Sequence, residues 1–441
     1  MYQCTNHTYD VCDIDDGRDA PFCPHGPTLL FSRMNTDSGE LEKFYACAVC
    51  RSKKDCNFYQ LFKTKETEEK KLIRREIYNQ FNHSSKHFKT FTGIESTSVL
   101  FCMDCGVIIP NDLCTNKSHP YQYKELSTEE FHYPSRWLRP KESNQTNAQY
   151  FFSPEVIEFL GAIILQNNAD RVLCVGVPSV HEHVKRDATM TGLSSFLLDL
   201  DVRLRQFHRD FAQYNMFNHH FYGKTEQENY EKFVQDAKRL VIIVDPPYGG
   251  LLGALQLTLN KMTASTAEVT TIVFLPYFME TQVRKHLPSL SMSDYKVNYT
   301  NHSGYTNEGK PRGSPARLYT DLPLKDLVLP TAQGYRYCEK CQHYISRENA
   351  HCPQCDSCTT KDGPTYEHCN QCKKCRKSTW IHCDACDKCV QVQHGCAKNS
   401  HGGDATIKLA RQKVFLEQPN KRKLPRTELK RRGQIQRKKA K

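Results

Sequence analysis

The sequence has no long apolar run. Hydrophobic residues make up 38% of the 441 residues, and no stretch approaches the roughly 20 consecutive apolar residues of a membrane helix. Residues 1–16 have no basic segment followed by an apolar one, so we expect no secretory signal and no membrane partner. We therefore interpret the 22 Cys for a reducing compartment, where clustered Cys bind metal more often than they form disulfides.

Most of the chain also lacks an excess of charge of one sign. The net charge is +12, but residues 408–441 hold 14 Lys and Arg against two acids, which alone gives +12. Subtracting these from the totals of 61 and 49 leaves 47 basic and 47 acidic residues upstream. This balance argues against a diffuse cationic surface and assigns the excess to one basic tail.

Cysteine is nearly absent from the middle of the chain. Nine Cys lie between Cys4 and Cys114 and twelve lie between Cys338 and Cys396, while Cys174 stands alone. A cysteine-poor segment, residues 150–330, therefore separates two cysteine-dense ends. We interpret this pattern as a core domain flanked by metal-dependent modules.

Short apolar runs alternate with helical patterns in this core. Strand-like runs occupy residues 171–176, 195–201, 240–244 and 269–275, and helical spacing occupies residues 154–166 and 249–263. Such alternation predicts an α/β fold with a parallel sheet covered on both faces. Ligands of these sheets bind beyond the carboxyl ends of the strands, so the residues after each run are site candidates.

The most informative of these positions follow the run at residues 240–244. Asp245, Pro246, Pro247 and Tyr248 come next, followed by a pair of glycines. The prolines stiffen the turn, the Asp carboxylate and the Pro246 carbonyl can accept hydrogen bonds from an amino group, and the Tyr ring can stack on a base. This chemistry suits methylation of a planar amino nitrogen, where acceptors stabilise the charge that develops. The alternative is a plain turn in which the prolines merely end a strand.

The four residues from Asp245 to Tyr248 resemble the Asp/Asn-Pro-Pro-Tyr/Phe motif of amino methyltransferases. Residues 23–31, 44–47, 55–58, 172–176, 214–221 and 244–250 extend the similarity. With them, residues 20–396 resemble the zinc-finger CCHC-type ribosomal-RNA adenine-N6 methyltransferase family. The resemblance implies catalysis by Asp245, Pro246, Pro247 and Tyr248, with S-adenosylmethionine as cofactor and large-subunit ribosomal RNA as substrate. Where relatives carry Phe in the last motif position, this chain has Tyr248, and both rings stack.

The same resemblance gives the fold and its expected divisions. It implies an α/β, Rossmann-like S-adenosylmethionine-dependent methyltransferase core flanked by N-terminal and C-terminal zinc-binding modules. The expected order is a GRF-type zinc finger (1–65), a C2CH or C2H2-like finger with a linker (66–145), the methyltransferase core (146–330), a Cys/His-rich CCHC-type module (331–400) and a basic, disordered tail (401–441).

The expected cofactor site lies around the first strand of the core. The turn after this strand has one glycine, Gly176, and a proline, which departs from the usual Gly-x-Gly pattern. Asp199 and Asp201 would lie on one face by strand alternation and compete for the ribose hydroxyls, with Asp199 preferred. Further cofactor candidates, by position, are Arg171, Cys174, Asn215, Met216 and Asp245. For Asn215 and Met216 the alternative is turn formation and core packing.

Two sets of zinc ligands are expected before the core. Cys23, His25, Cys47 and Cys56 resemble a GRF-type finger, a type that binds single-stranded nucleic acid in other proteins, and Cys50 is a rival of Cys47. The second set consists of two close pairs, Cys102 with Cys105 and Cys114 with His119. Zinc prefers thiolate and imidazole ligands in closed, tetrahedral structural sites, so both sets predict structural metal.

A repeat of His-Cys-x2-Cys-x2-Cys fills the C-terminal region. Its three copies contain His351, Cys352, Cys355, Cys358, His368, Cys369, Cys372, Cys375, His382, Cys383, Cys386 and Cys389. Cys338 and Cys341 precede the repeat, and His394 and Cys396 close it. These 16 candidate ligands would fill four tetrahedral sites, although three sites with spare residues are equally compatible, and the pairing stays open because ligation can interleave. Because little apolar sequence lies here, metal must supply much of the folding energy.

The tail and the modules predict an RNA partner. Basic clusters at residues 421–426, 430–432 and 437–439 indicate phosphate contacts or a nuclear or nucleolar address, so we expect the protein in nucleus, nucleolus and cytoplasm. Adenine N6 is a Watson–Crick group, so the target base must be unpaired or flipped. One alternative is a zinc-dependent RNA-binding scaffold with an inactive core. Another is methylation of cytosine N4 or of a glutamine amide, the latter disfavoured by Asp245 because glutamine enzymes usually carry Asn there.

Overall fold

The computed structural model describes residues 10–12, 20–35, 39–50, 53–82, 88–91, 98–109, 122–140, 149–264, 268–301, 314–361, 366–392 and 394–395. The chain forms two compact units, Met1–Arg347 and Glu348–Lys441. The second unit begins inside the range predicted for the C-terminal module. Across the described residues, every helix is too short or too polar to cross a bilayer.

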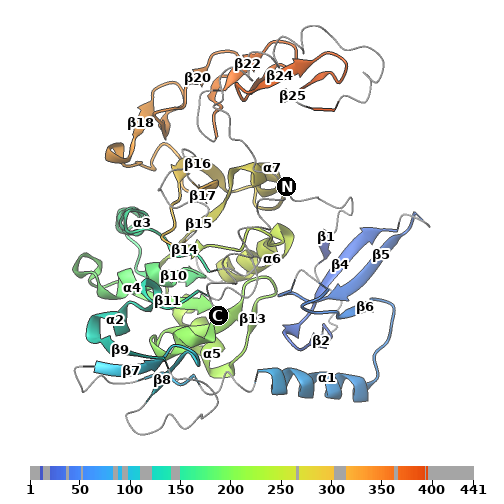
Figure 1. The fold of residues 1–441 in the computed structure, drawn as a ribbon, viewed down its shortest axis with the longest axis vertical. Helices are drawn as coiled ribbons and strands as arrows, with labels where there is room; N and C mark the ends of the chain where they lie inside the picture. Colours follow the sequence, from blue (N-terminus) through green and yellow to red (C-terminus); the bar gives the residue numbers. More distant parts are fainter. Residues whose placement is uncertain are drawn as a thin grey trace, which may run out of the picture. The chain divides into compact units, whose positions relative to one another are not determined.

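An eight-stranded sheet forms the centre of the first unit, in the order β13-β12-β11-β10-β14-β15-β17-β16 (Figure 1). The parallel strands are β10 (Arg171–Val175), β11 (Ser194–Asp199), β12 (Phe211–Asn215), β14 (Arg239–Val244) and β15 (Glu268–Pro276). At the edges, β13 (His220–Phe221) and β17 (Ala316–Thr320) run antiparallel to their neighbours, and β16 (Ser291–Lys296) pairs antiparallel with β17. The expected parallel sheet is therefore a mixed sheet, because the chain folds back at both edges.

Helices cover both faces of this sheet, which is why its central strands are continuous apolar runs. One face packs against α3 (Pro154–Gln166) and α4 (Pro178–Arg186). The other packs against α5 (Lys224–Gln235), α6 (Leu252–Thr263) and α7 (Glu280–His286). The helix predicted at residues 154–166 is confirmed with the same bounds, and the four predicted strands correspond to β10, β11, β14 and β15.

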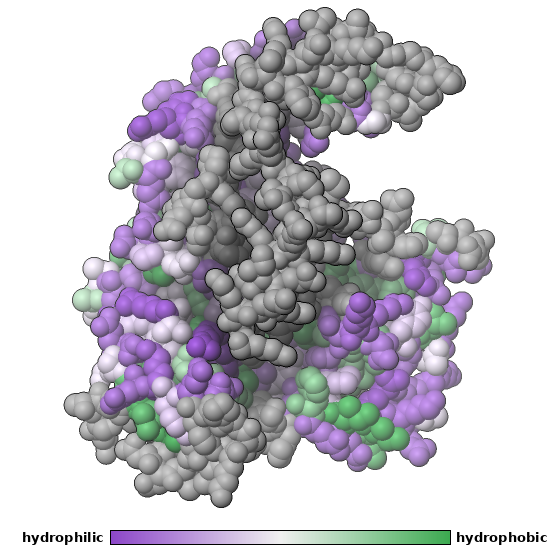
Figure 2. Space-filling model, viewed as in Figure 1, coloured by the Kyte–Doolittle hydropathy of each residue, from purple (hydrophilic) through white to green (hydrophobic). Residues whose placement is uncertain are grey.

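The N-terminal part of the first unit has its own antiparallel sheet. It contains β1 (Asp10–Cys12), β4 (Leu29–Met34), β5 (Leu41–Ala46) and β6 (Tyr59–Leu61), beside a small hairpin of β2 (Phe22–Cys23) and β3 (Gly26–Pro27). Helix α1 (Glu68–Phe81) follows, capped by the Thr67 hydroxyl, which accepts a hydrogen bond from the Lys70 amide. The apolar area at the lower right of Figure 2 lies over α1, whose Leu72, Ile73, Ile77 and Phe81 side chains are exposed.

A second small module packs directly on the core. Strands β7 (Ser98–Cys102), β8 (Val107–Ile109) and β9 (Tyr123–Ser127) form its sheet, and α2 (Thr128–His132) begins with a capping box between Ser127 and Glu130. Phe101, Leu126 and Phe131 are buried in the same apolar cluster as α3 and α4. This module therefore shares a core with the large sheet.

The C-terminal part consists of short hairpins. β18 (Tyr335–Cys338) and β19 (His343–Ser346) belong to the first unit. In the second unit, β20 (His351–Cys352) pairs with β21 (Ser357–Cys358), β22 (Glu367–Cys369) with β23 (Lys374–Arg376), and β24 (Trp380–Cys383) with β25 (Lys388–Gln391). Among its described residues only Asn349, Thr360, Cys369 and Cys383 are buried, so this unit has no apolar core there.

Candidate active site and metal centres

Four polar or turn-forming positions meet at the carboxyl ends of the parallel strands. Asp245 follows β14, Gly176 follows β10, Asp199 ends β11 and Asn215 ends β12. The Asp245 amide donates to the Val175 carbonyl over 3.1 Å, and the Gly176 amide donates to the Leu198 carbonyl over 2.8 Å. The edge of the sheet at which ligands bind in open α/β folds therefore carries the predicted motif.

Gly176 is required by the close approach of the turn to the motif. Its φ is +71°, in the left-handed region, and a Cβ there would lie 3.2 Å from the Asp245 carbonyl oxygen and 3.3 Å from Cε of Met216. A side chain at this position would be strained by the backbone conformation and would crowd the motif and the neighbouring strand end.

The Asp245 carboxylate faces a tyrosine that sequence reasoning missed. The Tyr299 hydroxyl donates to Oδ1 of Asp245 over 3.2 Å, and the Tyr248 hydroxyl donates to that of Tyr299 over 3.3 Å. Burial raises the pKa of the Asp245 carboxyl well above its usual range, and the Tyr299 hydrogen bond opposes this effect. Tyr299 belongs to no recognised motif and follows β16, far from Asp245 in the sequence. Its contact with Asp245 therefore becomes visible only in the folded structure.

Tyr299 is itself held by aromatic neighbours. Its ring is 4% exposed and stacks on Phe152 with a centroid distance of 5.4 Å, while Tyr150 lies at 5.7 Å. Burial, together with the nearby Asp245 charge, raises the pKa of the Tyr299 hydroxyl well above its usual range. The hydroxyl therefore stays protonated and acts as a donor to the carboxylate.

The N-terminal sheet, through Phe217, packs against the end of the motif opposite Tyr299. A Cβ on Gly250 would lie 2.5 Å from Cζ of Phe217, so the Phe217 ring packs directly on the end of the motif. Phe217 also joins the apolar cluster of Phe31 and Phe44 in the N-terminal sheet. The Asn218 amide group donates to the Pro27 carbonyl over 2.7 Å. The turn after β12, which carries Met216, is thus clamped between the motif and the N-terminal module.

The residues at this edge fit an adenosine-containing cofactor. Oδ1 of Asn215 accepts from the Phe217 amide over 3.1 Å, while its Nδ2 is buried and has no protein partner among the described residues. A buried donor without a partner calls for a ligand acceptor, such as a ring nitrogen. Asp199 is only partly buried, so its carboxylate can meet hydroxyl groups from solvent or ligand.

Three predicted cofactor residues make other contacts in the structure. Arg171 begins β10, at the opposite end of that strand from Gly176, and pairs with Asp170 and Asp236 at 3.8 and 3.7 Å. Cys174 is fully buried beside the Ser195 hydroxyl at 3.5 Å, and burial raises the pKa of its thiol to about 12. Asp201 does not continue the alternation of β11, because the strand ends at Asp199 and Asp201 caps the 3-10 turn η5 (Val202–Gln206).

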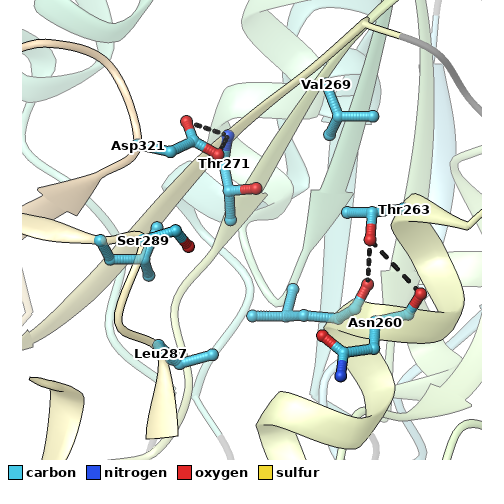
Figure 3. A pocket seen from close by; sticks show the side chains of 9 residues that line it. Asn260, Thr263, Val269, Thr271, Leu287, Ser289 and Asp321 are labelled. Carbon is cyan, nitrogen blue, oxygen red and sulfur yellow. Dashed lines mark hydrogen bonds between the residues drawn. The ribbon is translucent and has the colours of Figure 1, made fainter. Parts of the chain in front are cut away.

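A pocket of about 350 Å3 lies near the amino end of β15, at the end of the parallel strands opposite the motif (Figure 3). It is lined by Val269 and Thr271 at the start of β15, by the end of α6 and by Asp321. The Asp321 carboxylate accepts from the Thr271 amide over 2.9 and 3.1 Å. Because this is the amino end of the parallel strands and no predicted site residue lines it, the pocket is separate from the motif.

The first metal centre gathers the predicted ligands Cys23, His25, Cys47 and Cys56. Their ligand atoms all lie within 4.8 Å of one another, and Sγ of Cys47 is 3.7 Å from Nδ1 of His25. These spacings suit a tetrahedral zinc ion with thiolate and imidazole ligands. The Cys50 amide donates to Sγ of Cys47 over 3.3 Å, although its own Sγ also lies 3.6 Å from Nε2 of His25.

The second set is described only in part. Cys102 and Cys105 lie at the turn between β7 and β8, and the Cys105 amide donates to Sγ of Cys102 over 3.4 Å. The predicted partners Cys114 and His119 lie outside the described residues. Gly106, directly after Cys105, has a φ of +70°. The residues after the second Cys of the later pairs, Gln342, Asp356, Lys373 and Asp387, share this left-handed conformation. The same local turn therefore recurs at five Cys-x2-Cys pairs.

The repeat in the second unit interleaves its ligands. Each cluster takes the first two Cys of one hairpin and the His and last Cys of the next: Cys352, Cys355, His368 and Cys375, then Cys369, Cys372, His382 and Cys389. A third cluster contains Cys383, Cys386 and His394, and the predicted ligand Cys396 lies outside the described residues. Of the remaining predicted ligands, Cys338 and Cys341 lie at the β18–β19 turn, and His351 and Cys358 lie in the β20–β21 hairpin. The sequence left this pairing open.

Known proteins resemble this chain over most of its length. Residues 143–321 match a family described as "Probable N6-adenine methyltransferase". The rRNA N(6)-adenosine-methyltransferase ZCCHC4 of Mus musculus is 39% identical over 359 residues, which cover 75% of this chain and 70% of that protein. The protein of the same name from Homo sapiens is 37% identical over 369 residues, covering 77% and 71%. The one from Xenopus laevis is 37% identical over 357 residues, covering 75% and 73%.

Proposed function

The chain belongs to the rRNA N(6)-adenosine-methyltransferase family, and from this we propose that it methylates N6 of an unpaired or flipped adenine in large-subunit ribosomal RNA. The family predicted from the sequence is thereby confirmed, and the chain is an enzyme that uses S-adenosylmethionine. Its Cys and His clusters can hold several structural zinc ions. We further infer that the central sheet is the Rossmann-like core of this enzyme class.

The observation that carries the proposal is the Asp245 carboxylate, held by Tyr299 at the carboxyl end of β14 and beside the Gly176 turn. S-adenosylmethionine supplies an electrophilic methyl group on a sulfonium. The Asp245 carboxylate and the Pro246 carbonyl would each accept a hydrogen bond from the N6 amino group. These bonds would stabilise the positive charge that develops as the nitrogen is methylated. The half-buried Tyr248 ring would stack on the adenine and hold its amine in line.

The neighbouring strand ends supply cofactor contacts. Asp199 would accept hydrogen bonds from the ribose hydroxyls, and the unpartnered Nδ2 of Asn215 would donate to a ring nitrogen of the adenosine. Met216 would lie against the ring, since its Cε already approaches the Gly176 turn. Arg171 and Cys174 have no part in this arrangement because of the positions described above.

Transfer of labelled methyl from S-adenosylmethionine to ribosomal RNA tests the proposal. Wild type should produce N6-methyladenosine, and Asp245→Ala should lower transfer at least about 100-fold while the variant stays folded. Label in N4-methylcytosine or in protein would favour the alternative substrates. Cofactor binding without any transfer would favour an inactive RNA-binding scaffold.

The zinc modules and the tail would bind RNA, and the tail would also direct the protein to its place in the cell. We propose that both modules grip structured RNA and that the basic tail adds sequence-independent phosphate contacts, so removal of residues 408–441 should flatten the salt dependence of RNA binding. We also propose nuclear or nucleolar as well as cytoplasmic localisation. Imaging of the full chain and of the chain without this tail tests that address, and an unchanged distribution would contradict it.

A further inference from the structure

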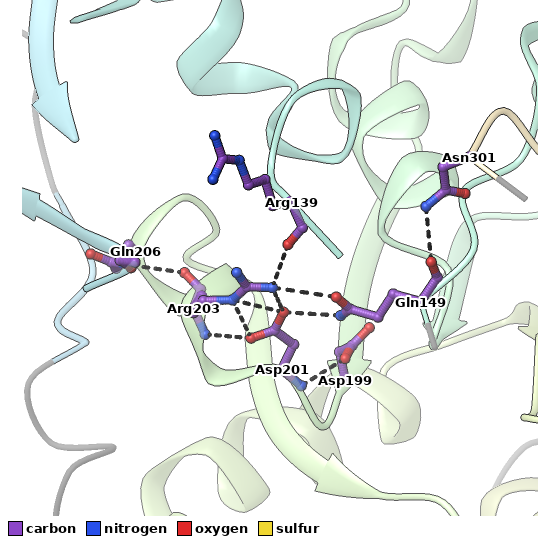
Figure 4. Close-up of polar contacts among 8 residues, drawn as sticks. Arg139, Gln149, Asp199, Asp201, Arg203, Gln206 and Asn301 are labelled. Atoms are coloured by element: carbon purple, nitrogen blue, oxygen red, sulfur yellow. Dashed lines mark hydrogen bonds and ion pairs between the residues drawn. The ribbon is translucent and has the colours of Figure 1, made fainter. Parts of the chain in front are cut away.

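A buried carboxylate next to the cofactor edge is fully committed to protein donors. Asp201 is 3% exposed, and its two oxygens accept from Nε of Arg203 at 3.0 and 3.1 Å and from the terminal Nη2 of the same guanidinium at 2.7 Å (Figure 4). Nε2 of Gln149 donates to Oδ2 over 2.9 Å, and the Arg203 amide donates to Oδ1 over 3.1 Å. A carboxylate offers about four acceptor positions, so Asp201 has none left for a ribose.

Asp201 acts instead on its neighbour Asp199. The Asp201 amide donates to Oδ1 of Asp199 over 2.8 Å. This bond fixes one oxygen of the Asp199 carboxylate, whose side chain remains partly exposed at the end of β11. The backbone of Asp201 therefore sets the direction of the Asp199 carboxylate, and the Arg203 ion pair sets the position of Asp201.

The Arg203 side chain packs on the turn between β7 and β8, which carries the predicted zinc ligands Cys102 and Cys105. A Cβ on Gly106 would lie 2.9 Å from Cδ of Arg203, so the Gly106 backbone packs directly on the arginine stem. Nε2 of Gln206 donates to the Gly106 carbonyl over 2.8 Å, and its Oε1 accepts from the Ile108 amide over 2.7 Å. Gln206 is 2% exposed, so these bonds are buried and expensive to break. η5 is thus fixed to the turn that follows Cys105.

The opposite end of the network reaches the target side of the site. The Gln149 carbonyl accepts from Nδ2 of Asn301 over 2.9 Å (Figure 4). Oδ1 of Asn301 accepts from the Phe151 amide over 2.9 Å. Asn301 lies two residues after Tyr299, the donor to Asp245. Contacts between these residues therefore connect the β7–β8 turn to Asp199 and lead to the segment that carries Tyr299, the donor to Asp245.

From this geometry we propose that Arg203 is a positioning residue for the cofactor carboxylate Asp199, with the β7–β8 turn of the second zinc module as its support. The inference rests on the proposed function, because it assigns the ribose contact to Asp199. It also gives the second module a task apart from RNA: an intact turn at Cys105 and Gly106 keeps the cofactor site in shape. Asp201 is then a structural partner of Arg203.

The test is a double-mutant cycle on cofactor affinity in the full, zinc-loaded chain. Arg203→Met keeps the stem that packs on Gly106 but removes the guanidinium, and we expect S-adenosylmethionine to bind about tenfold more weakly by calorimetry. Asp199→Ala should weaken binding by at least as much. Adding Arg203→Met to Asp199→Ala should cause almost no further loss, because both changes remove the same ribose contact.

The matched control is Arg205→Met, which removes an arginine of similar side-chain exposure, 17% against 15%, that also lies in η5 and is ion-paired with Glu226 on α5. It should leave cofactor affinity within about twofold of wild type. Arg203→Lys retains the charge without the fork and should restore part of the affinity, which covers the case of an Arg203→Met variant that fails to fold. Affinity for a ribosomal RNA fragment should change little in either Arg203 variant.

Two results would overturn the inference. The first is an Arg203→Met or Arg203→Lys protein that folds and binds the cofactor as tightly as wild type. The second is an equal, additive loss in the Asp199→Ala background, which would indicate a general destabilisation. Failure of the proposed function is distinguishable, because then the wild-type chain itself would not bind S-adenosylmethionine.

Discussion

Asp245 is a carboxylate in an environment that penalises its charge. Burial raises its pKa, and among its described neighbours the Tyr299 hydroxyl provides the opposing hydrogen bond. In the proposed function, the amino group of the target base would donate a further hydrogen bond to this carboxylate. Substrate binding would then offset part of the cost of its buried charge.

Asp245→Asn tests this cost through two pH dependences. The folded-state pKa of Asp245 lies above its unfolded value, so its contribution to the free energy of unfolding is favourable in acid and is lost as the pH rises toward the folded pKa. The Asn variant should therefore melt at a higher temperature than wild type at neutral pH, and the gap should close in acid. In the wild type, the rate of methyl transfer should rise with pH as Asp245 ionises. The Asn variant should lack this rise, because it has no carboxyl group at this position. Equal melting temperatures at all pH values would contradict this account.

Tyr299→Phe should move the wild-type activity profile in a defined direction. The hydroxyl bond favours the ionised carboxylate, so its removal raises the pKa of Asp245 further and shifts the rise of kcat/KM to higher pH. At pH 7 we expect transfer to fall about fivefold. Tyr295→Phe removes another buried hydroxyl, on β16 against Phe159, and should leave the profile in place. A shift toward acid in the Tyr299 variant would rule out the assigned role.

At this scale the sequence reveals a residue only when its chemistry is local. Asp245 and Tyr248 directly follow a buried apolar run and flank two prolines, so their place at the carboxyl end of β14 was predictable. Tyr299 comes 54 residues after Asp245, and the contact exists only because the aromatic segment around Phe152 pairs with it beside β15. Similarly, the sequence could not show that β11 ends at Asp199. This end is the reason that Asp199 and Asp201 do not share a face of the strand.

Among the elements, the motif turn depends on a close contact between a glycine and a ring. Phe217 sits in the turn between β12 and β13, and its ring leaves no room for a side chain at Gly250. Since Phe217 also packs on Phe31 and Phe44, the N-terminal sheet, the β12–β13 turn and the motif form one packed contact. A change at Gly250 should therefore act on catalysis through the shape of the turn.

Gly250→Ala should displace either the motif or Phe217. The added Cβ would lie 2.5 Å from the ring and 2.9 Å from the Pro247 carbonyl oxygen. We expect a loss of stability of about 1–3 kcal/mol and a fall in methyl transfer of tenfold or more, because the acceptors for the amine move. Thermal unfolding and single-turnover transfer measure the two effects. Gly249→Ala is the control for stability, since its Cβ would meet nothing within 4 Å, and a similar loss in both variants would exclude the Phe217 contact as the cause.

The predictability of the elements follows their burial. The central runs gave β10, β11, β14 and β15 because strands covered on both faces must be apolar. β16 (Ser291–Lys296) and β17 (Ala316–Thr320) mix polar with apolar residues, and their pairing is set by contacts far apart in sequence. The apolar runs therefore did not predict the antiparallel edge strands. They did predict the carboxyl ends of β10, β11 and β14, where the candidate site residues lie.

At the scale of the whole molecule, the two units obtain their stability from different sources. All apolar clusters among the described residues lie in the first unit, and the second has short hairpins joined by Cys and His clusters. Because each cluster joins one hairpin to the next, removal of one ion should loosen two hairpins. The repeat was visible in the sequence, but the interleaving was not, since equal spacing permits ligation within or between copies.

His382→Ala tests the interleaved arrangement. His382 lies in the third hairpin of the second unit but belongs with Cys369 and Cys372 of the second hairpin and with Cys389. We expect the variant to lose one zinc per chain by elemental analysis and to become sensitive to protease within residues 366–392, while residues 149–264 stay protected by their apolar core. Cofactor binding, which uses the first unit, should persist. His343→Ala, whose Nδ1 lies 2.8 Å from a backbone carbonyl oxygen and which belongs to no cluster among the described residues, should retain every zinc. Full zinc content in His382→Ala would show that the hairpins are not linked in this way.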